Sequence, residues 1–299
     1  MLFHAGLPLL PGGYVGVDRW RESLVELAVP LMTRIIAVNA PLTRFPEGTP
    51  FVPCNLSPTL REAKDAIPSL SAEGCHRGYD STDGSPCRFG SDEAPVIALV
   101  GDSHAAHWFP GLKRWAESAG FALQTYTKSA CPAADVVPLR DGSPYVACSR
   151  WRAEVVRRLR AAPPALALLA SYGGASVEDA RGFDAASTDG LSRTIGSLAP
   201  GGPVVVLADT PNLGETPASC LSAHLGSAEA CGRDLTDYLC SADFCLPIIG
   251  STLVHRDAHH LTPDFSERLA PILGEAITAL IGCPGSAFPR GGGGPMPCR

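Results

Sequence analysis

The sequence has no cluster of basic side chains. Of its 299 residues, 24 are Lys or Arg and 30 are Asp or Glu, so the formal net charge is -6 at pH 7. A protein that binds nucleic acid needs a basic surface to neutralise the phosphates, and no run of Lys and Arg interleaved with aromatic residues occurs here. The composition therefore excludes nucleic acid as an expected partner.

Long uninterrupted hydrophobic runs are also absent. The most apolar stretch, residues 24–42, is interrupted by Glu26, Arg34 and prolines, so it predicts a packed or interfacial helix rather than a membrane-spanning one. The N-terminus lacks the basic segment that opens a secretory signal peptide, and prolines break its short apolar run. We expect at most a weak association of residues 1–45 with a membrane.

The Cys-x-x-Cys pair on which structural zinc sites usually rely does not occur either, although the sequence holds 11 cysteines. So many cysteines favour disulfides formed in an oxidising, extracytoplasmic compartment over a zinc site, with free buried thiols as the remaining alternative. Three local pairs bracket short loops. The predicted disulfides are Cys131 to Cys148, Cys220 to Cys231, and Cys240 to Cys245.

Composition divides the chain into three parts. Residues 1–50 are apolar, are interrupted by Pro and Gly, and end in a linker-like run, so we place them outside the main domain. Residues 54–282 form this domain, which opens with a polar, turn-rich lead-in at 54–93. Residues 283–299 form a glycine-rich, flexible tail without core residues.

The cysteines outside the three predicted disulfides lie in the lead-in and near the C-terminus. Cys54, Cys75 and Cys87 are expected to hold the lead-in, with no pairing assigned. The odd total leaves at least one thiol unpaired within a monomer, and Cys298 is the candidate. The pairing of Cys283 stays open.

Between the lead-in and the tail, short apolar runs of strand length alternate with stretches of helix length. This order predicts a mainly parallel sheet covered by helices on both faces, a three-layer α/β domain. The predicted strands are 96–100, 122–127, 165–170 and 204–208, and the predicted helices are 110–118, 148–160, 190–198 and 263–280.

The first predicted strand runs directly into Gly-Asp-Ser-His. Ligands collect where the carboxyl ends of parallel strands meet helix N-termini, because free backbone N–H groups and the helix dipole favour negative charge there. Gly101 permits a sharp turn, Asp102 can cap or brace it, and Ser103 can point into the crevice. The alternative is an ordinary turn with a helix cap, which the tripeptide alone does not exclude.

A second motif precedes the predicted C-terminal helix. A serine hydroxyl needs an imidazole within hydrogen-bond reach, and that imidazole needs a carboxylate to hold its tautomer. Asp257 and His260 supply both groups at a spacing of three, and we expect the carboxylate to raise the pKa of the imidazole. In the alternative, Asp257 is a cap and His259 or His260 is a loop residue. The two motifs together are more specific than either one.

These residues resemble the SGNH (GDSL-type) esterase and acyltransferase superfamily, and in particular the SGNH domain fused to bacterial membrane acyltransferases of the acyltransferase 3 family. The resemblance covers residues 54–282. It implies a three-layer α/β/α, flavodoxin-like fold, with Ser103 as nucleophile, His260 as general base and Asp257 as its orienting acid. The matching blocks are Val100-Gly101-Asp102-Ser103-His104-Ala105-Ala106-His107-Trp108, Lys128-Ser129-Ala130-Cys131-Pro132 and Asp257-Ala258-His259-His260-Leu261-Thr262.

The chain departs from the family pattern at two positions that usually serve the oxyanion hole. Ala130 stands where the second block usually has Gly, and it keeps the backbone N–H that can act as a donor. The Asn of the third block has no counterpart, because the strand at 165–170 is followed by Ser171, which is the candidate substitute. His104 and Asp102 are further candidates for oxyanion or substrate contacts.

The N-terminus carries a second resemblance. Residues 3–8, which include His4, and residues 12–18 resemble the opening of the acyltransferase 3 membrane domain, whereas a Pro/Gly loop is the simpler interpretation. The apolar spans that should follow are missing. We interpret residues 1–50 as a truncated remnant of that membrane domain and its linker.

The resemblance implies transfer of an acyl group, most simply acetyl, to hydroxyls of a cell-envelope or exported polysaccharide through an acyl-serine intermediate. The expected partners are a glycan acceptor and an acyl donor, which a membrane acyltransferase domain can deliver. A carbohydrate acetylesterase using the same serine and an inactive glycan-binding accessory domain are the alternatives. No cofactor or metal is expected, because no third ligand accompanies His104 and His107 in the sequence.

Overall fold

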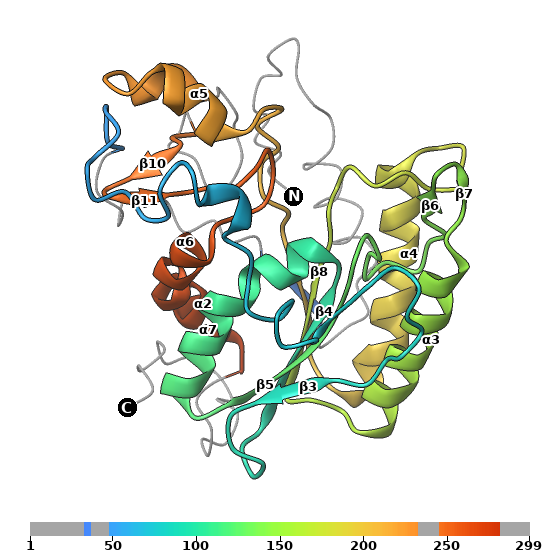
Figure 1. Cartoon of the computed structure of the whole chain (residues 1–299). Coiled ribbons are helices and arrows are strands. Elements are labelled where there is room, and N and C mark those ends of the chain that lie inside the picture. Colours follow the sequence, from blue (N-terminus) through green and yellow to red (C-terminus); the bar gives the residue numbers. More distant parts are fainter. Residues whose placement is uncertain (1–32, 37–47, 233–244, 282–299) are drawn as a thin grey trace, which may run out of the picture.

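The computed structural model describes residues 33–36, 48–232 and 245–281, and in this part of the chain a seven-stranded sheet lies between two layers of helices (Figure 1). The strand order is β1-β9-β8-β4-β5-β2, and β3 also pairs with β5. All pairings in this sheet are parallel except that of β3 with β5. The predicted fold class, a three-layer α/β domain with a mainly parallel sheet, is confirmed.

The main elements alternate along the chain as an α/β domain requires. The strands of the large sheet are β1 (Thr33–Ile36), β2 (His76–Arg77), β3 (Cys87–Phe89), β4 (Val96–Gly101), β5 (Ala122–Lys128), β8 (Leu166–Ala170) and β9 (Val204–Leu207). The helices are α2 (Ser103–Ala119), α3 (Val146–Ala161), α4 (Phe183–Leu198), α5 (Pro217–Ala223), α6 (Pro263–Arg268) and α7 (Ala270–Ile281). The short elements are η2 (Ala63–Asp65), β6 (Leu139–Arg140), β7 (Ser143–Pro144), η3 (Ala199–Gly201), η4 (Ala228–Cys231), β10 (Ile248–Ile249) and β11 (Thr252–Leu253).

The helix boundaries differ from the predicted ones for local reasons. Helix α2 begins at Ser103 rather than at Pro110, because Asp102 caps it directly after the strand and Pro110 lies inside the helix. The predicted C-terminal helix is divided at Leu269 into α6 and α7. Pro271 at the second position of α7 favours this break, since proline is best tolerated in a first helical turn.

The first 50 residues contribute a strand to the main sheet, contrary to the predicted domain boundary. Residues 33–36 form β1, which pairs in parallel with β9 from Thr33 opposite Val204 to Ile36 opposite Leu207. The packed helix predicted within residues 24–42 is therefore wrong at these positions. The run Thr-Arg-Ile-Ile is rich in β-branched residues, which favour a strand.

The two helical layers bury both faces of the sheet. On β4, Ile97 and Leu99 pack into one hydrophobic core with residues of α2 and α7. Ala98 and Val100 point to the other face and join a second core with residues of α3 and α4 (Figure 1). Because β4 is buried on both faces, its carboxyl end is fixed in position.

The lead-in extends the sheet and also packs against a small separate lobe. A disulfide joins Cys75 to Cys87 with a Cα separation of 5.6 Å, next to β2 and at the start of β3. Cys54 is exposed and free. A third hydrophobic cluster combines Leu56 of the lead-in with Leu253 of β11 and other residues of the lobe that holds α5, β10 and β11 (Figure 1).

Two of the predicted disulfides lie entirely within the described residues. Cys131 is bonded to Cys148 and Cys220 to Cys231, with Cα separations of 5.4 and 5.6 Å. Cys245 is also disulfide-bonded, and its predicted partner Cys240 lies outside the described residues. Cys283 and Cys298, the two N-terminal segments at residues 3–8 and 12–18 and the predicted tail also lie outside them. No described helix is both long and apolar enough to cross a membrane.

We predict that the double variant Cys131→Ala/Cys148→Ala is less stable by about 2–5 kcal/mol, because the bond closes a 17-residue separation between two fully buried side chains. Urea unfolding followed by circular dichroism measures this loss. Cys54→Ala, which removes an exposed free thiol, is the control and is expected to keep the wild-type midpoint. Equal midpoints for all three proteins would refute the prediction.

Candidate active site

The turn after β4 holds Ser103 at the first position of α2. Gly101 has a φ of 150°, and a Cβ atom at this position would lie 1.8 Å from the carbonyl oxygen of Ala170. The Asp102 carboxylate accepts the N–H of His104 at 2.8 Å and the N–H of Tyr172 at 2.9 Å. The turn is therefore fixed to its own helix and to the end of the neighbouring strand β8.

The structure brings Ser103 together with the two residues of the second motif. Ser103 Oγ lies 2.9 Å from His260 Nε2. His260 Nδ1 lies 2.8 and 3.0 Å from the two carboxylate oxygens of Asp257. This carboxylate also accepts the backbone N–H of His259 at 3.0 Å and that of His260 at 2.8 Å. The result is a continuous chain from hydroxyl to imidazole to carboxylate.

Burial and hydrogen bonding set the charges in this chain. Burial and the charges of His104 and Arg256 lower the pKa of His260. The hydrogen bond that Asp257 accepts and its charge raise this pKa, as expected, but the net shift is downward. Burial would raise the pKa of Asp257, but the hydrogen bonds from His260 and from two backbone N–H groups hold it well below its usual range. At neutral pH the imidazole is therefore neutral and the carboxylate ionised, which are the states a general base and its orienting acid require.

His259 belongs to a second chain, beside the first. Its Nδ1 lies 2.8 Å from His104 Nε2, and His104 Nδ1 is hydrogen-bonded to Asp209. The ring of Tyr172 stacks on His259 with a centroid separation of 4.7 Å. No spacing in the sequence pointed to Asp209 or Tyr172 as site residues. The only available signal was their place just after the strands at 204–208 and 165–170, whose carboxyl ends meet at one edge.

Two residues named as oxyanion or substrate contacts lie behind the serine instead. Asp102 and His104 are each 1% exposed, and their polar atoms are used by neighbouring groups of the protein. Burial raises the pKa of Asp102. Burial lowers the pKa of His104, but the charge and hydrogen bond of Asp209, together with the charges of Asp102 and Asp257, raise it overall. Both residues therefore support the site from inside.

The other two candidates, Ala130 and Ser171, are exposed and half-buried, respectively. Ala130 is exposed and has a φ of 49°, the left-handed conformation that a glycine would adopt without strain. Within the described residues, the backbone N–H groups of Ala130 and Ser103 donate to no other protein group. Ser171 Oγ accepts the N–H of Ala133 at 2.8 Å, which ties the end of β8 to the second block.

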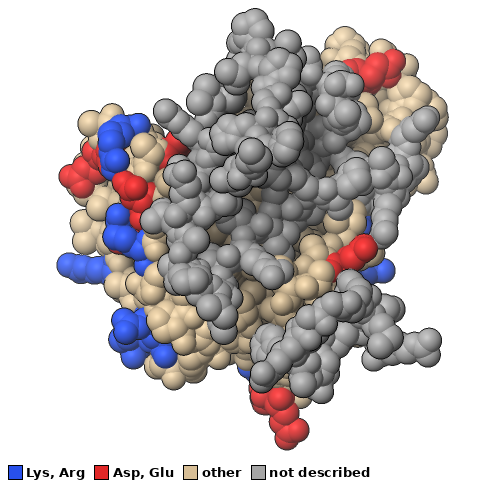
Figure 2. Space-filling model, turned by 180° about the vertical axis from the view of Figure 1, so that it is seen from behind, with Lys and Arg blue, Asp and Glu red and all other residues tan. Residues whose placement is uncertain are grey.

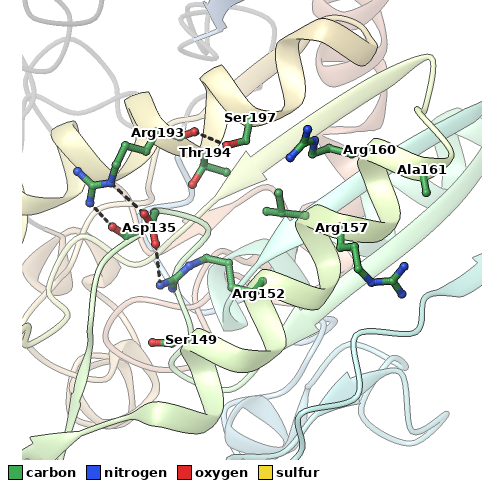
Figure 3. A pocket seen from close by; sticks show the side chains of 11 residues that line it. Asp135, Ser149, Arg152, Arg157, Arg160, Ala161, Arg193, Thr194 and Ser197 are labelled. Atoms are coloured by element: carbon green, nitrogen blue, oxygen red, sulfur yellow. Dashed lines mark hydrogen bonds and ion pairs between the residues drawn. The ribbon is translucent and has the colours of Figure 1, made fainter.

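A cavity of about 590 Å³ lies away from this site, between α3 and α4 (Figure 3). Arg152 and Arg193 line it, and both pair with Asp135. None of Ser103, Asp257 and His260 lines it. Seen from behind, Lys and Arg gather at the side that carries α3 and α4, with Asp and Glu among them (Figure 2). The charged residues that line the cavity are mainly arginines, and it is not the site of Ser103.

The chain is similar to known proteins in two comparisons. The family model described as "SGNH domain (fused to AT3 domains)" matches residues 74–233. A search of curated proteins found no match. One solved structure similar to this chain is the periplasmic domain of a lipopolysaccharide acetyltransferase from Salmonella ser. Paratyphi A, with 19% identity, coverage of 62% of this chain and 85% of that chain, and a TM-score of 0.49.

We predict that Gly101→Ala lowers stability by about 3 kcal/mol, because the added Cβ meets the backbone of β8, which cannot move aside. Thermal or urea unfolding measures the change. The matched control is Gly196→Ala in α4, where a Cβ meets nothing within 4 Å and helix propensity favours alanine. Wild-type stability in Gly101→Ala would show that the turn is not constrained as described.

Proposed function

Because the chain belongs to the family of SGNH domains fused to AT3 domains, we propose that it transfers an acyl group, most simply acetyl, to hydroxyls of a cell-envelope or exported polysaccharide. The observation that supports this most strongly is the hydrogen bond of 2.9 Å between Ser103 Oγ and His260 Nε2, continued to Asp257 at 2.8 Å. The proposed catalytic residues are Ser103, His260 and Asp257.

In the first half of the proposed reaction, His260 Nε2 takes the proton of Ser103 as Oγ bonds to the acyl carbon of the donor. The tetrahedral intermediate then collapses, its bond to the donor oxygen breaks, and His260 returns the proton to that oxygen. In the second half, a sugar hydroxyl gives its proton to His260 and attacks the acyl carbon of the acyl-Ser103 ester. The bond between that carbon and Ser103 Oγ then breaks, and His260 returns the proton to Oγ. Asp257 holds the imidazole tautomer and stabilises the imidazolium in both halves.

The negative charge of the tetrahedral intermediate needs hydrogen-bond donors. We assign this role to the backbone N–H groups of Ser103 and Ala130, which have no other protein partner among the described residues. The family's third-block Asn is absent, and loss of one oxyanion donor typically costs about 10²–10³ in rate. The hydroxyl of Ser171 is the proposed substitute, because its oxygen already bonds the second-block loop at Ala133.

The disulfides support a location outside the cytoplasm, where thiols are oxidised. There the chain would meet an envelope polysaccharide directly. We assign delivery of the acyl donor to a membrane acyltransferase domain, the partner to which this family of SGNH domains is fused.

We predict that the protein hydrolyses a chromogenic acetyl ester and that a serine-directed phosphonate labels Ser103 covalently, whereas Ser103→Ala does neither. Mass spectrometry of the labelled peptide identifies the residue. An acetylated glycan donor is then incubated with and without a free acceptor glycan. Transfer of acetyl to the acceptor supports the transferase, release of free acetate alone supports an esterase, and the absence of both turnover and labelling would leave only a binding domain.

We predict that activity rises with pH through a midpoint below 6.5, because the base must be neutral and burial lowers the pKa of His260. Asp257→Asn should lower the rate on the order of 10⁴-fold, since the imidazole loses the acceptor that holds its tautomer. His259→Ala should have a far smaller effect than His260→Ala. Ester turnover in each variant from pH 4 to 9 tests this. Near-full turnover in His260→Ala with none in His259→Ala would assign the base to the other ring.

A further inference from the structure

Three imidazoles converge beside Ser103. His104, His259 and His260 each offer one ring nitrogen, and these three atoms all lie within 4.8 Å of one another. The closest pair, His104 Nε2 and His259 Nδ1, is 2.8 Å apart and shares one proton. Two nitrogens bound to the same tetrahedral zinc ion lie about 3.3 Å apart, given Zn–N distances of 2.0–2.1 Å. Small side-chain rotations therefore suffice to place an ion between the three rings.

Carboxylates already orient two of these rings in the way that metal-binding histidines require. His104 Nδ1 is hydrogen-bonded to Asp209, and His260 Nδ1 lies 2.8 Å from Asp257. Each ring therefore directs Nε2 away from its carboxylate, toward Nδ1 of His259 in one case and toward Ser103 in the other. In metal sites such a carboxylate fixes the ring and increases the basicity of the ligating nitrogen.

We propose that His104, His259 and His260 form a binding site for Zn²⁺ or a similar first-row divalent cation, and that the bound ion reversibly inhibits acyl transfer. Imidazole nitrogens suit Zn²⁺, Co²⁺, Ni²⁺ and Cu²⁺, and three of them leave a fourth position for water or for the oxygen of Ser103. From the sequence no metal was expected, because no third ligand accompanies His104 and His107 there. The structure pairs His104 with the two adjacent histidines of the distant Asp-x-x-His loop.

The inhibition follows from the use of a single lone pair, and this part rests on the proposed function. His260 Nε2 is the atom that accepts the proton of Ser103, and a metal bound to this nitrogen occupies the same lone pair. The proton now shared by His104 and His259 passes to solvent when the metal enters. Metal binding and activation of the serine therefore exclude each other.

Metal binding is tested without reference to activity. Tag-free, EDTA-treated protein is titrated with Co²⁺, and the visible absorption of a tetrahedral ion is recorded, followed by competition with Zn²⁺. We expect one ion per chain in the wild type and in Ser103→Ala, and at least tenfold weaker binding in His259→Gln. Asp209→Asn should weaken binding by about 10–100-fold, since it removes the carboxylate behind His104.

His224→Gln is the matched control, because His224 is exposed at the end of α5 and lies outside the cluster. Equal Co²⁺ binding by wild type and His259→Gln would overturn the site. Inhibition is measured as the ratio of ester turnover with and without Zn²⁺ for each variant, so that a changed basal rate cancels. We expect Zn²⁺ to inhibit ester turnover in the wild type and in His224→Gln, and to inhibit it less in Asp209→Asn.

Activation by Zn²⁺, or equal inhibition in Asp209→Asn and wild type, would overturn the inhibitory role. Protein that binds Co²⁺ through these histidines but has no ester turnover would contradict the proposed function and leave the metal site standing. Protein that turns over ester but binds no Co²⁺ would contradict the metal site and leave the proposed function standing.

Discussion

The site depends on the buried carboxylate of Asp102. One of its oxygens accepts the N–H of His104 and the other that of Tyr172, so a single side chain joins the start of α2 to the residues that follow β8. The close approach of Gly101 to the carbonyl of Ala170 allows the two strands to be tied at this distance. Ser103 therefore stands on a turn that is fixed on both sides, and the ring of Tyr172 is brought against His104.

A second carboxylate separates two adjacent histidines. Asp257 accepts the backbone N–H groups of both His259 and His260, which holds the loop in one conformation. From this loop the ring of His260 reaches Ser103 and the ring of His259 reaches His104, although their centroids are only 4.2 Å apart. Neighbouring residues with the same side chain thus take part in different hydrogen-bonded chains. The spacing from Asp257, rather than the residue type, determines which ring meets the serine.

The sequence predicted the parts of the structure that depend on local pattern. Buried strands such as β4 are continuous apolar runs in the sequence. The spacing of Asp257 from His260 predicted that both lie on one loop, and in the structure the ring of His260 on this loop meets Ser103. Asp209 was not predicted as a site residue, because only the sheet order β9-β8-β4 brings the end of β9 near His104. The strand β1 was missed because its four residues lie within a longer stretch of mixed pattern. Burial around His260, which decides the direction of its pKa shift, is likewise a property of the folded chain.

The two carboxylate-bound imidazoles, His104 and His260, have opposite pKa shifts for a physical reason. His104 is buried and His260 is largely buried. The charges of Asp209, Asp102 and Asp257 and the hydrogen bond of Asp209 together outweigh burial at His104, whereas Asp257 does not offset burial and the neighbouring positive charges at His260. The rings lie 4.7 Å apart, so positive charge on His104 further disfavours a proton on His260. In the resting site His260 is thereby kept neutral and ready to accept the serine proton. During the proposed reaction His260 becomes an imidazolium, which the positive charge of His104 repels. The carboxylate of Asp257, which is hydrogen-bonded to the ring of His260, offsets this repulsion.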